Sequence, residues 1–164
     1  MRAIGISIAL ALFATAAVAQ QGGAQSMKTY SSAADVAALQ AKAKSDRKDG
    51  QPLVVERILQ LAPYNANLEY RASVGPASIH EKEAEVFYVI DGSATMVTGG
   101  KLTKESRTNA ENLTGSGIEG GTPRNVGKGD FIVVPEGTPH WFSSINGSIT
   151  MMSLHVPRAG GGTN

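Results

Sequence analysis

Short stretches that alternate apolar with polar residues fill most of the chain after residue 52. The first of them, Leu53–Leu61, is rich in β-branched residues and stands between Pro52 and a turn at Pro63. Similar stretches follow, separated by glycine-containing turns, at 68–74, 85–90, 93–98, 131–134, 140–145 and 148–156. About eight or nine short strands of this kind, joined by tight turns, predict an all-β sandwich or barrel.

A different spacing precedes these strands. Ser32 fits a helix N-cap, and Asp35 stands three residues later, in the position of a capping box. Apolar residues then recur at intervals of three and four, at Val36, Leu39 and Ala43. The pattern predicts a short helix from residue 33 to about residue 44, packed against the outside of the barrel. Residues 31–50 are therefore interpreted as this N-terminal helix and a linker, and residues 51–157 as the barrel.

The first nineteen residues have the parts of a secretory signal peptide. Arg2 supplies a positive charge, a short apolar segment follows, and Ala17-Val18-Ala19 is a cleavage signal. A transmembrane anchor is disfavoured because the apolar run is short for a bilayer. We therefore expect export to a bacterial periplasm with cleavage near Ala19-Gln20. The remaining ends, 20–30 and 158–164, are expected to be a flexible leader and a flexible tail.

Composition narrows the kinds of partner and of site. The chain contains no cysteine, which excludes disulfides and thiolate metal sites. Its 15 Lys and Arg nearly balance 14 Asp and Glu, without a block of like charges. Nucleic acid and anionic membranes are therefore not expected as partners.

One long segment, 101–124, does not follow the strand pattern. It is polar and rich in Gly, Asn, Ser and Thr. Long segments of this kind in compact domains are often functional or mobile. Two interpretations stay open at this point: a lid near a pocket, or an insertion on the surface.

Three residues that can bind a metal stand at the ends of predicted strands. His80 and Glu85 flank a polar, turn-like stretch, so that a chain reversal between them would bring their side chains together across two strands. His140 follows the turn Pro135-Glu-Gly-Thr-Pro and begins another strand. Two imidazoles and one carboxylate arranged in this way can form a facial triad with open positions for water or substrate.

These stretches resemble the two motifs of the cupin superfamily, G-x5-H-x-H-x3/4-E-x6-G and G-x5-P-x-G-x2-H-x3-N. Glu85 and Gly92 keep the E-x6-G spacing, and Gly129, Pro135, Gly137 and His140 keep the second motif through its histidine. The resemblance covers roughly residues 53–156. It implies a double-stranded β-helix, or jelly-roll barrel, with His80, Glu85 and His140 as ligands of one divalent transition metal such as Fe, Mn, Ni, Cu or Zn.

The first motif departs from the family pattern at one ligand position. The resemblance aligns the family's first histidine with Ser78, whose hydroxyl is a poor ligand for such ions. Ser78 could contact a bound water or a substrate instead. The alternative is a vestigial site, in which the two histidines are ordinary polar residues and the barrel binds no metal.

Four other residues are weaker candidates for the pocket or for a supporting role. His155, on the last predicted strand, could donate a supporting hydrogen bond to the site or be purely structural. Phe87 and Phe142 each follow a candidate ligand by two residues and so share its strand face. Tyr70 is placed with them because it alternates with other apolar residues on its strand. Plain core packing is the competing interpretation for all three aromatic residues.

Two functions of different classes remain open. The first is a metal-dependent lyase, isomerase or dioxygenase that acts on a small polar molecule. The second is a non-catalytic cupin module that binds a small ligand without metal. Fold alone does not choose between them. A homodimer is compatible with either function.

Overall fold

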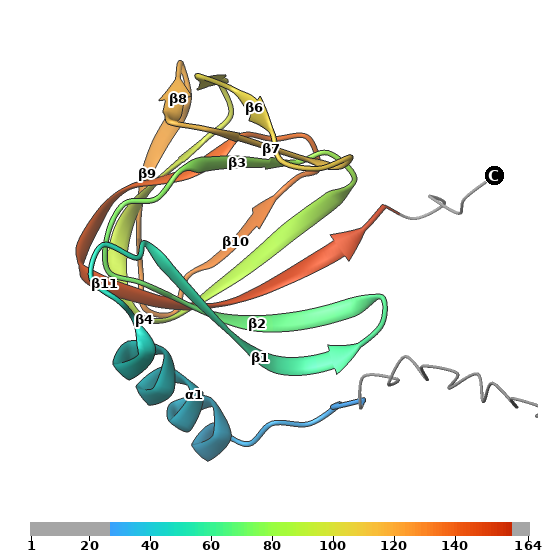
Figure 1. Cartoon of the computed structure of the whole chain (residues 1–164), viewed down its shortest axis with the longest axis vertical. Helices are drawn as coiled ribbons and strands as arrows, with labels where there is room; N and C mark the ends of the chain where they lie inside the picture. Colours follow the sequence, from blue (N-terminus) through green and yellow to red (C-terminus); the bar gives the residue numbers. More distant parts are fainter. Residues whose placement is uncertain (1–26, 159–164) are drawn as a thin grey trace, which may run out of the picture.

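The computed structural model describes residues 27–158, which form one helix packed on a β-barrel (Figure 1). The predicted signal peptide lies outside these residues. The elements are α1 (Ala33–Asp46), β1 (Leu53–Leu61), β2 (Tyr64–Arg71), β3 (Ala77–His80), β4 (Glu83–Thr98), β5 (Lys101–Thr103), β6 (Ser106–Arg107), β7 (Asn112–Gly115), β8 (Gly117–Glu119), β9 (Thr122–Gly127), β10 (Phe131–Val134) and β11 (His140–Pro157). The prediction of an all-β jelly-roll with a short N-terminal helix is confirmed.

Two long strands, β4 and β11, run through the nine-stranded sheet that forms the barrel wall. They pair antiparallel with each other from His140 opposite Thr98 to Pro157 opposite Glu83. β11 also pairs with β2 and β3, while β4 also pairs with β9 and β10. Each long strand therefore contributes to more than one part of the barrel wall (Figure 1).

Two of the glycine-containing turns expected between strands, Asp91-Gly92 between 85–90 and 93–98 and Asn146-Gly147 between 140–145 and 148–156, are not chain reversals, and this prediction was wrong. β4 and β11 continue through these positions as single strands. Gly92 and Gly147 have positive φ, and the ladder between the two strands changes register beside them. The glycines therefore form irregularities within long strands rather than chain reversals.

The barrel interior is packed with large apolar side chains. Phe87 and Phe142 meet edge to face with ring centroids 5.7 Å apart, and both are almost fully buried. The other buried members of this inner cluster are Val89, Ala94, Met96, Val126, Val134, Ile149 and Met151. This inner cluster is the floor on which the candidate site rests.

A second cluster lies outside the barrel, where α1 packs against β1 and β2 (Figure 1). Ser32 and Asp35 form the predicted capping box at the start of the helix. The predicted stripe Val36, Leu39 and Ala43 faces the sheet, and Ala43 is fully buried against it. This outer cluster is completed by Val54, Ile58, Ala66, Leu68 and Tyr70.

The outer cluster corrects the position of Tyr70. The sequence grouped Tyr70 with the pocket, but Tyr70 belongs to the cluster under α1, on the outside of the barrel. The opposite face of β2 carries Glu69 and Arg71, and Arg71 lies over the inner Phe142 ring. Because α1 covers the outer face, the apolar side chains of β2 point outward and its charged ones inward.

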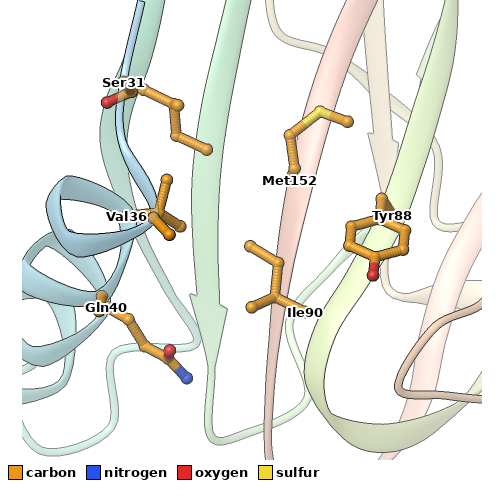
Figure 2. A pocket seen from close by; sticks show the side chains of 9 residues that line it. Ser31, Val36, Gln40, Tyr88, Ile90 and Met152 are labelled. Carbon is orange, nitrogen blue, oxygen red and sulfur yellow. The ribbon is translucent and has the colours of Figure 1, made fainter.

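A groove of about 470 Å³ separates α1 from the sheet. Figure 2 shows Val36 and Gln40 of the helix on one side and Ile90 and Met152 of the sheet on the other. Gln40 crosses toward the sheet and donates a hydrogen bond to Thr150 at 3.2 Å. No helix among residues 27–158 is long and apolar enough to cross a membrane.

The long polar segment 101–124 extends the barrel wall. Its strand β7 pairs with β3, and β6 pairs with β7 beyond it, while β5 and β8 form a separate two-stranded sheet. Ion pairs between Arg107 and Glu81 (2.7 Å) and between Lys82 and Glu111 (3.2 Å) join the segment to the β3–β4 turn. The segment is thus neither a free lid nor a remote insertion, because it is hydrogen-bonded to the strand that carries His80.

Both ends of the described chain are attached to the barrel. Lys28, within the stretch expected to be a flexible leader, exchanges two backbone hydrogen bonds with Gln60, each 2.8 Å long. At the other end, the Arg158 guanidinium pairs with Glu136.

Candidate metal centre

Three strands bring together all three histidines of the chain and one glutamate. His80 ends β3, Glu85 lies near the start of β4, and β11 supplies His140 at its first position and His155 near its last. His80 and Glu85 lie on either side of the β3–β4 connection, but β3 pairs with β7 and β11 rather than with β4, so the two residues meet without the cross-strand pairing that the sequence predicted. His155 stands directly opposite Glu85 in the β4–β11 ladder.

The three imidazoles direct the same ring nitrogen at Glu85. The Nε2 atoms of His80 and His140 lie 3.3 and 3.1 Å from Glu85 Oε2. His155 Nε2 lies 3.4 Å from the other carboxylate oxygen, Oε1. The His80 ring is 5.3 Å from the His140 ring and 4.7 Å from the His155 ring, between centroids. The four side chains therefore form one compact cluster.

The opposite nitrogen of each ring faces an oxygen acceptor. Nδ1 of His80 lies 2.5 Å from Asn112 Oδ1, and Nδ1 of His155 lies 3.0 Å from Glu83 Oε2. For His140 the acceptor is the Thr138 carbonyl, at a longer 3.4 Å. An amide oxygen, a carboxylate and a carbonyl can each accept a hydrogen bond from Nδ1–H, so a neutral ring directs its Nε2 lone pair at Glu85, whereas a cationic ring donates Nε2–H to it.

Glu85 is buried and ionised. Only 4% of its side chain is exposed. Burial raises its pKa, yet the histidine nitrogens that face it, His140 first, lower it by more, so the pKa of Glu85 lies well below the usual glutamate range. Oε2 nevertheless has no hydrogen bond of good geometry, although the Nε2 atoms of His80 and His140 face it. A buried, charged oxygen without a hydrogen bond is costly unless a cation satisfies it.

The two partly exposed histidines also have perturbed pKa values. Burial lowers the pKa of His80, but its contacts with Glu85 and Asn112 raise it by more. Contact with Glu85 is the largest influence on His155 and raises its pKa against the opposing effect of burial. Both imidazoles are thus stabilised in the cationic form by the same carboxylate.

The cluster has the donor set and the spacing of a transition-metal site. Imidazole and carboxylate are ligands for Zn, Cu, Fe and Ni. Ligand atoms about 2.1 Å from a shared ion lie about 3.0–3.4 Å from one another, which is the range of the three nitrogen–oxygen distances at Glu85. His80, Glu85 and His155 have candidate ligand atoms all within 4.8 Å of one another, and His140 adjoins them through Glu85. The residues present therefore fit a divalent metal.

The remaining predicted site residues lie around this cluster. Ser78 is the cross-strand neighbour of His140, and no hydrogen bond among the described residues joins its hydroxyl to Glu85 or to a histidine. Phe87 lies beneath the site, with its ring 6.2 Å from that of His140. Phe142 lies one ring further into the barrel and contacts Phe87. Both aromatic residues belong to the inner cluster, as the core-packing interpretation expected.

The sequence predicted a supporting or structural role for His155, whereas the structure places it with His80 and Glu85 in a group that could hold a metal. His155 follows no family motif, and its neighbours on the strand are apolar. The available signal was its position near the end of a strand that also begins with His140. In a strand that spans the barrel and returns to the same mouth, both ends can supply a ligand. His155 comes from a different strand than Ser78, and it adds a third imidazole beside Glu85, after His80 and His140.

The fold and the site are those of a β-barrel protein in which histidines and a glutamate at one end of the barrel could hold a metal. The chain belongs to the cupin family, whose model matches residues 52–156. No curated protein matches the sequence significantly.

Solved structures with the same fold are distant in sequence. FeII HppE is 15% identical with a TM-score of 0.50, and the match covers 66% of this chain and 53% of HppE, so this chain spans about half the length of that protein. KdgF from Halomonas sp. is 16% identical (TM-score 0.49, 69% and 87% covered). A putative mannose-6-phosphate isomerase from Ralstonia eutropha JMP134 is 15% identical (TM-score 0.48, 70% and 94% covered). At these identities the likenesses concern the fold alone.

Proposed function

We propose that this protein is a metal-binding cupin in which His80, Glu85, His140 and His155 hold one divalent transition metal. The observation that carries the proposal is the convergence of three Nε2 atoms on one buried carboxylate at 3.1–3.4 Å. In a neutral ring with the proton on Nδ1, each Nε2 presents a lone pair to a negatively charged oxygen, an arrangement that a proton on Nε2 or a bound metal cation would stabilise.

The proposal supports a chemistry of small polar substrates. A divalent ion in this position would act as a Lewis acid or activate oxygen. With four protein ligands, an octahedral ion keeps two positions for a small acid or enolate. The cluster is reached from the side of His80 and His155, whose side chains are 21% and 28% exposed, while His140 and Glu85 are almost fully buried. A lyase, isomerase or dioxygenase is the kind of enzyme that such a site serves.

Metal analysis of the protein tests the proposal directly. The protein should be purified without a histidine tag and its metal content measured by mass spectrometry, with about one divalent ion expected per chain. His80→Ala, His140→Ala and His155→Ala should each lower the occupancy. Ser78→Ala is the matched control, because Ser78 neighbours His140 but is not among the proposed ligands. A folded protein that takes up no Fe, Mn, Ni, Cu or Zn would remove the basis of the proposal.

Turnover separates the two classes of function. The loaded protein should be assayed for oxygen uptake and product formation against a panel of small acids and catechols. Turnover that disappears in His140→Ala supports the enzyme. Saturable binding of a panel member without turnover supports the ligand-binding module instead.

We further propose that the chain is exported to the periplasm, on the basis of the signal-peptide pattern of residues 1–19. The test is to express the full chain in a bacterium and to separate periplasm from cytoplasm. The periplasmic form should begin at Gln20 by N-terminal sequencing. Recovery of the unprocessed chain in the cytoplasm alone would contradict export.

A further inference from the structure

The segment 101–124 contacts the candidate metal centre through one residue, Asn112. Asn112 is the first residue of β7 and stands opposite His80 in the β3–β7 ladder. Its Oδ1 lies 2.5 Å from His80 Nδ1. None of the family motifs includes this position, since it lies between them in the polar segment.

The orientation of the Asn112 amide is fixed by a second asparagine. Asn112 Nδ2 donates a hydrogen bond to Asn109 Oδ1 at 2.9 Å. The same Asn109 oxygen accepts a hydrogen bond from the backbone N–H of Glu111, also at 2.9 Å. A backbone N–H can only donate, so Asn109 must present its oxygen at this point. A flipped Asn112 would then place its own oxygen against the oxygen of Asn109, which is unfavourable.

These hydrogen bonds determine which atom of Asn112 faces the imidazole of His80. With its amino group held by Asn109, Asn112 can present only its oxygen to His80 Nδ1. An oxygen acceptor requires the proton on Nδ1, which in the neutral ring leaves Nε2 unprotonated and directed at Glu85, 3.3 Å away. The backbone of the segment thereby selects one of the two neutral tautomers of His80.

We propose that Asn112 is a positioning residue that holds His80 in the Nδ1–H tautomer and so prepares Nε2 as a ligand. The inference rests on the proposed metal site for its functional meaning. The tautomer itself is a property of the metal-free protein. It gives the segment 101–124 a role in the site: it neither closes over the metal nor binds it, but sets the protonation pattern of one ligand.

The experiment uses three variants of the full chain. Asn112→Leu is similar in size and removes the acceptor, whereas Asn112→Asp keeps an oxygen facing His80. Thr114→Val is the matched control, because it deletes another side-chain hydrogen bond between β7 and β3, from Thr114 Oγ1 to the Ala77 carbonyl at 3.0 Å, without touching His80. Far-ultraviolet circular dichroism and an unfolding midpoint establish that each variant is folded.

The first readout is the tautomer of His80 in metal-free protein, from long-range ¹H–¹⁵N correlation spectra recorded at a pH at which a titration in the same spectra shows the ring to be neutral, since, against the effect of burial, Glu85 and Asn112 raise the pKa of His80 above its usual value. Wild type, Asn112→Asp and Thr114→Val should show the Nδ1–H form. Asn112→Leu should show a mixture or the Nε2–H form. The same Nδ1–H spectrum in Asn112→Leu as in wild type would overturn the inference, whether or not the protein binds metal.

The second readout is metal affinity by competition with a coloured chelator, using Zn²⁺ as the probe. Asn112→Leu should bind Zn²⁺ about tenfold to a hundredfold more weakly, the usual cost of losing a partner of a ligating histidine. Asn112→Asp should restore most of this affinity, and Thr114→Val should leave it unchanged. An equal loss in Thr114→Val would show that strand pairing, not the acceptor, is responsible. Absence of Zn²⁺ binding in wild type would instead count against the proposed function and leave the tautomer result standing.

Discussion

Two glutamates are buried in this barrel, and their surroundings differ. Glu69 receives two hydrogen bonds from the Arg71 guanidinium, at 2.8 and 3.2 Å, and a third from the Ser153 hydroxyl at 2.9 Å. Glu85 faces only histidine nitrogens, and its Oε2 has no hydrogen bond. Arginine is cationic at every relevant pH, whereas the charge of histidine is conditional.

The difference separates a structural carboxylate from a binding one. The charge of Glu69 is balanced within the protein by the permanent cation of Arg71, so no bound ion is needed to balance it. The charge of Glu85 is balanced only by protons on the neighbouring histidines or by a bound ion in place of those protons. Burial of a carboxylate alone therefore does not indicate a binding site, but a buried carboxylate whose partners are charged only at some pH values does.

The largest effect on stability is expected from Glu69→Ala. Removal of this carboxylate leaves the Arg71 guanidinium, whose side chain is only 15% exposed, without its charged partner. We expect the free energy of unfolding to fall by about 3–5 kcal/mol in urea denaturation. Glu56→Ala is the control, since Glu56 pairs with the exposed Lys42 and should cost less than about 1 kcal/mol. A similar loss in both variants would contradict the structural role of the inner pair.

Glu85→Gln should affect metal affinity strongly and stability more weakly. It removes the negative charge on which the three histidines converge while keeping the shape of the side chain. Zn²⁺ affinity, measured by chelator competition, should fall at least about a hundredfold, or roughly 2.7 kcal/mol. The unfolding midpoint of the metal-free protein should fall less than in Glu69→Ala, because no permanent cation is left unpaired. If this variant unfolds like Glu69→Ala and still binds metal, the distinction between the two glutamates is wrong.

A smaller effect is expected from Glu83→Gln. Glu83 accepts the Nδ1 proton of His155 at 3.0 Å and is itself about one third exposed. An uncharged amide is a weaker acceptor, so the variant should bind Zn²⁺ about tenfold less tightly. Titration calorimetry can resolve this change, and Glu81→Gln on the adjoining turn serves as a control. If Glu81→Gln weakens Zn²⁺ binding as much as Glu83→Gln does, the loss comes from the removal of negative charge near the site rather than from the contact with His155.

The smallest effect is expected from Ser153→Ala. The variant removes one neutral donor from Glu69 and should lower the free energy of unfolding by about 1 kcal/mol. Ser153 lies two residues from His155 on the same strand, yet metal binding should be unchanged. A parallel loss of metal affinity would show that the two glutamates are coupled through β11.

Much of this architecture could be predicted because it depends on local signals. The capping box of α1 and the bounds of β1 follow from residues adjacent in sequence. The proximity of His80 to Glu85 follows from a turn-like stretch between two strands. The hairpin signals were less informative, because a glycine with positive φ produces either a reversal or a bulge, and the choice depends on which strands lie alongside.

The rest depends on contacts between distant residues. The inward direction of Glu69 and the outward direction of Tyr70 cannot be deduced from alternation, since both faces of β2 are covered. His155 reaches the site only because β11 crosses the whole barrel opposite β4. Asn112 could not be linked to His80 from the sequence, because the pairing of β7 with β3 carries no motif.

The length of β11 also has a consequence for the order of folding. Its first residue, His140, pairs with Thr98, but its far end, with His155, pairs with the beginning of β4, a much longer stretch of chain away. Closing larger loops costs more entropy, and such non-local pairings slow folding. We therefore expect His140 to be fixed in the nascent barrel before His155 arrives beside Glu85. Assembly of the centre would then mark completion of the barrel, and tight metal capture would report that the last strand has docked in register.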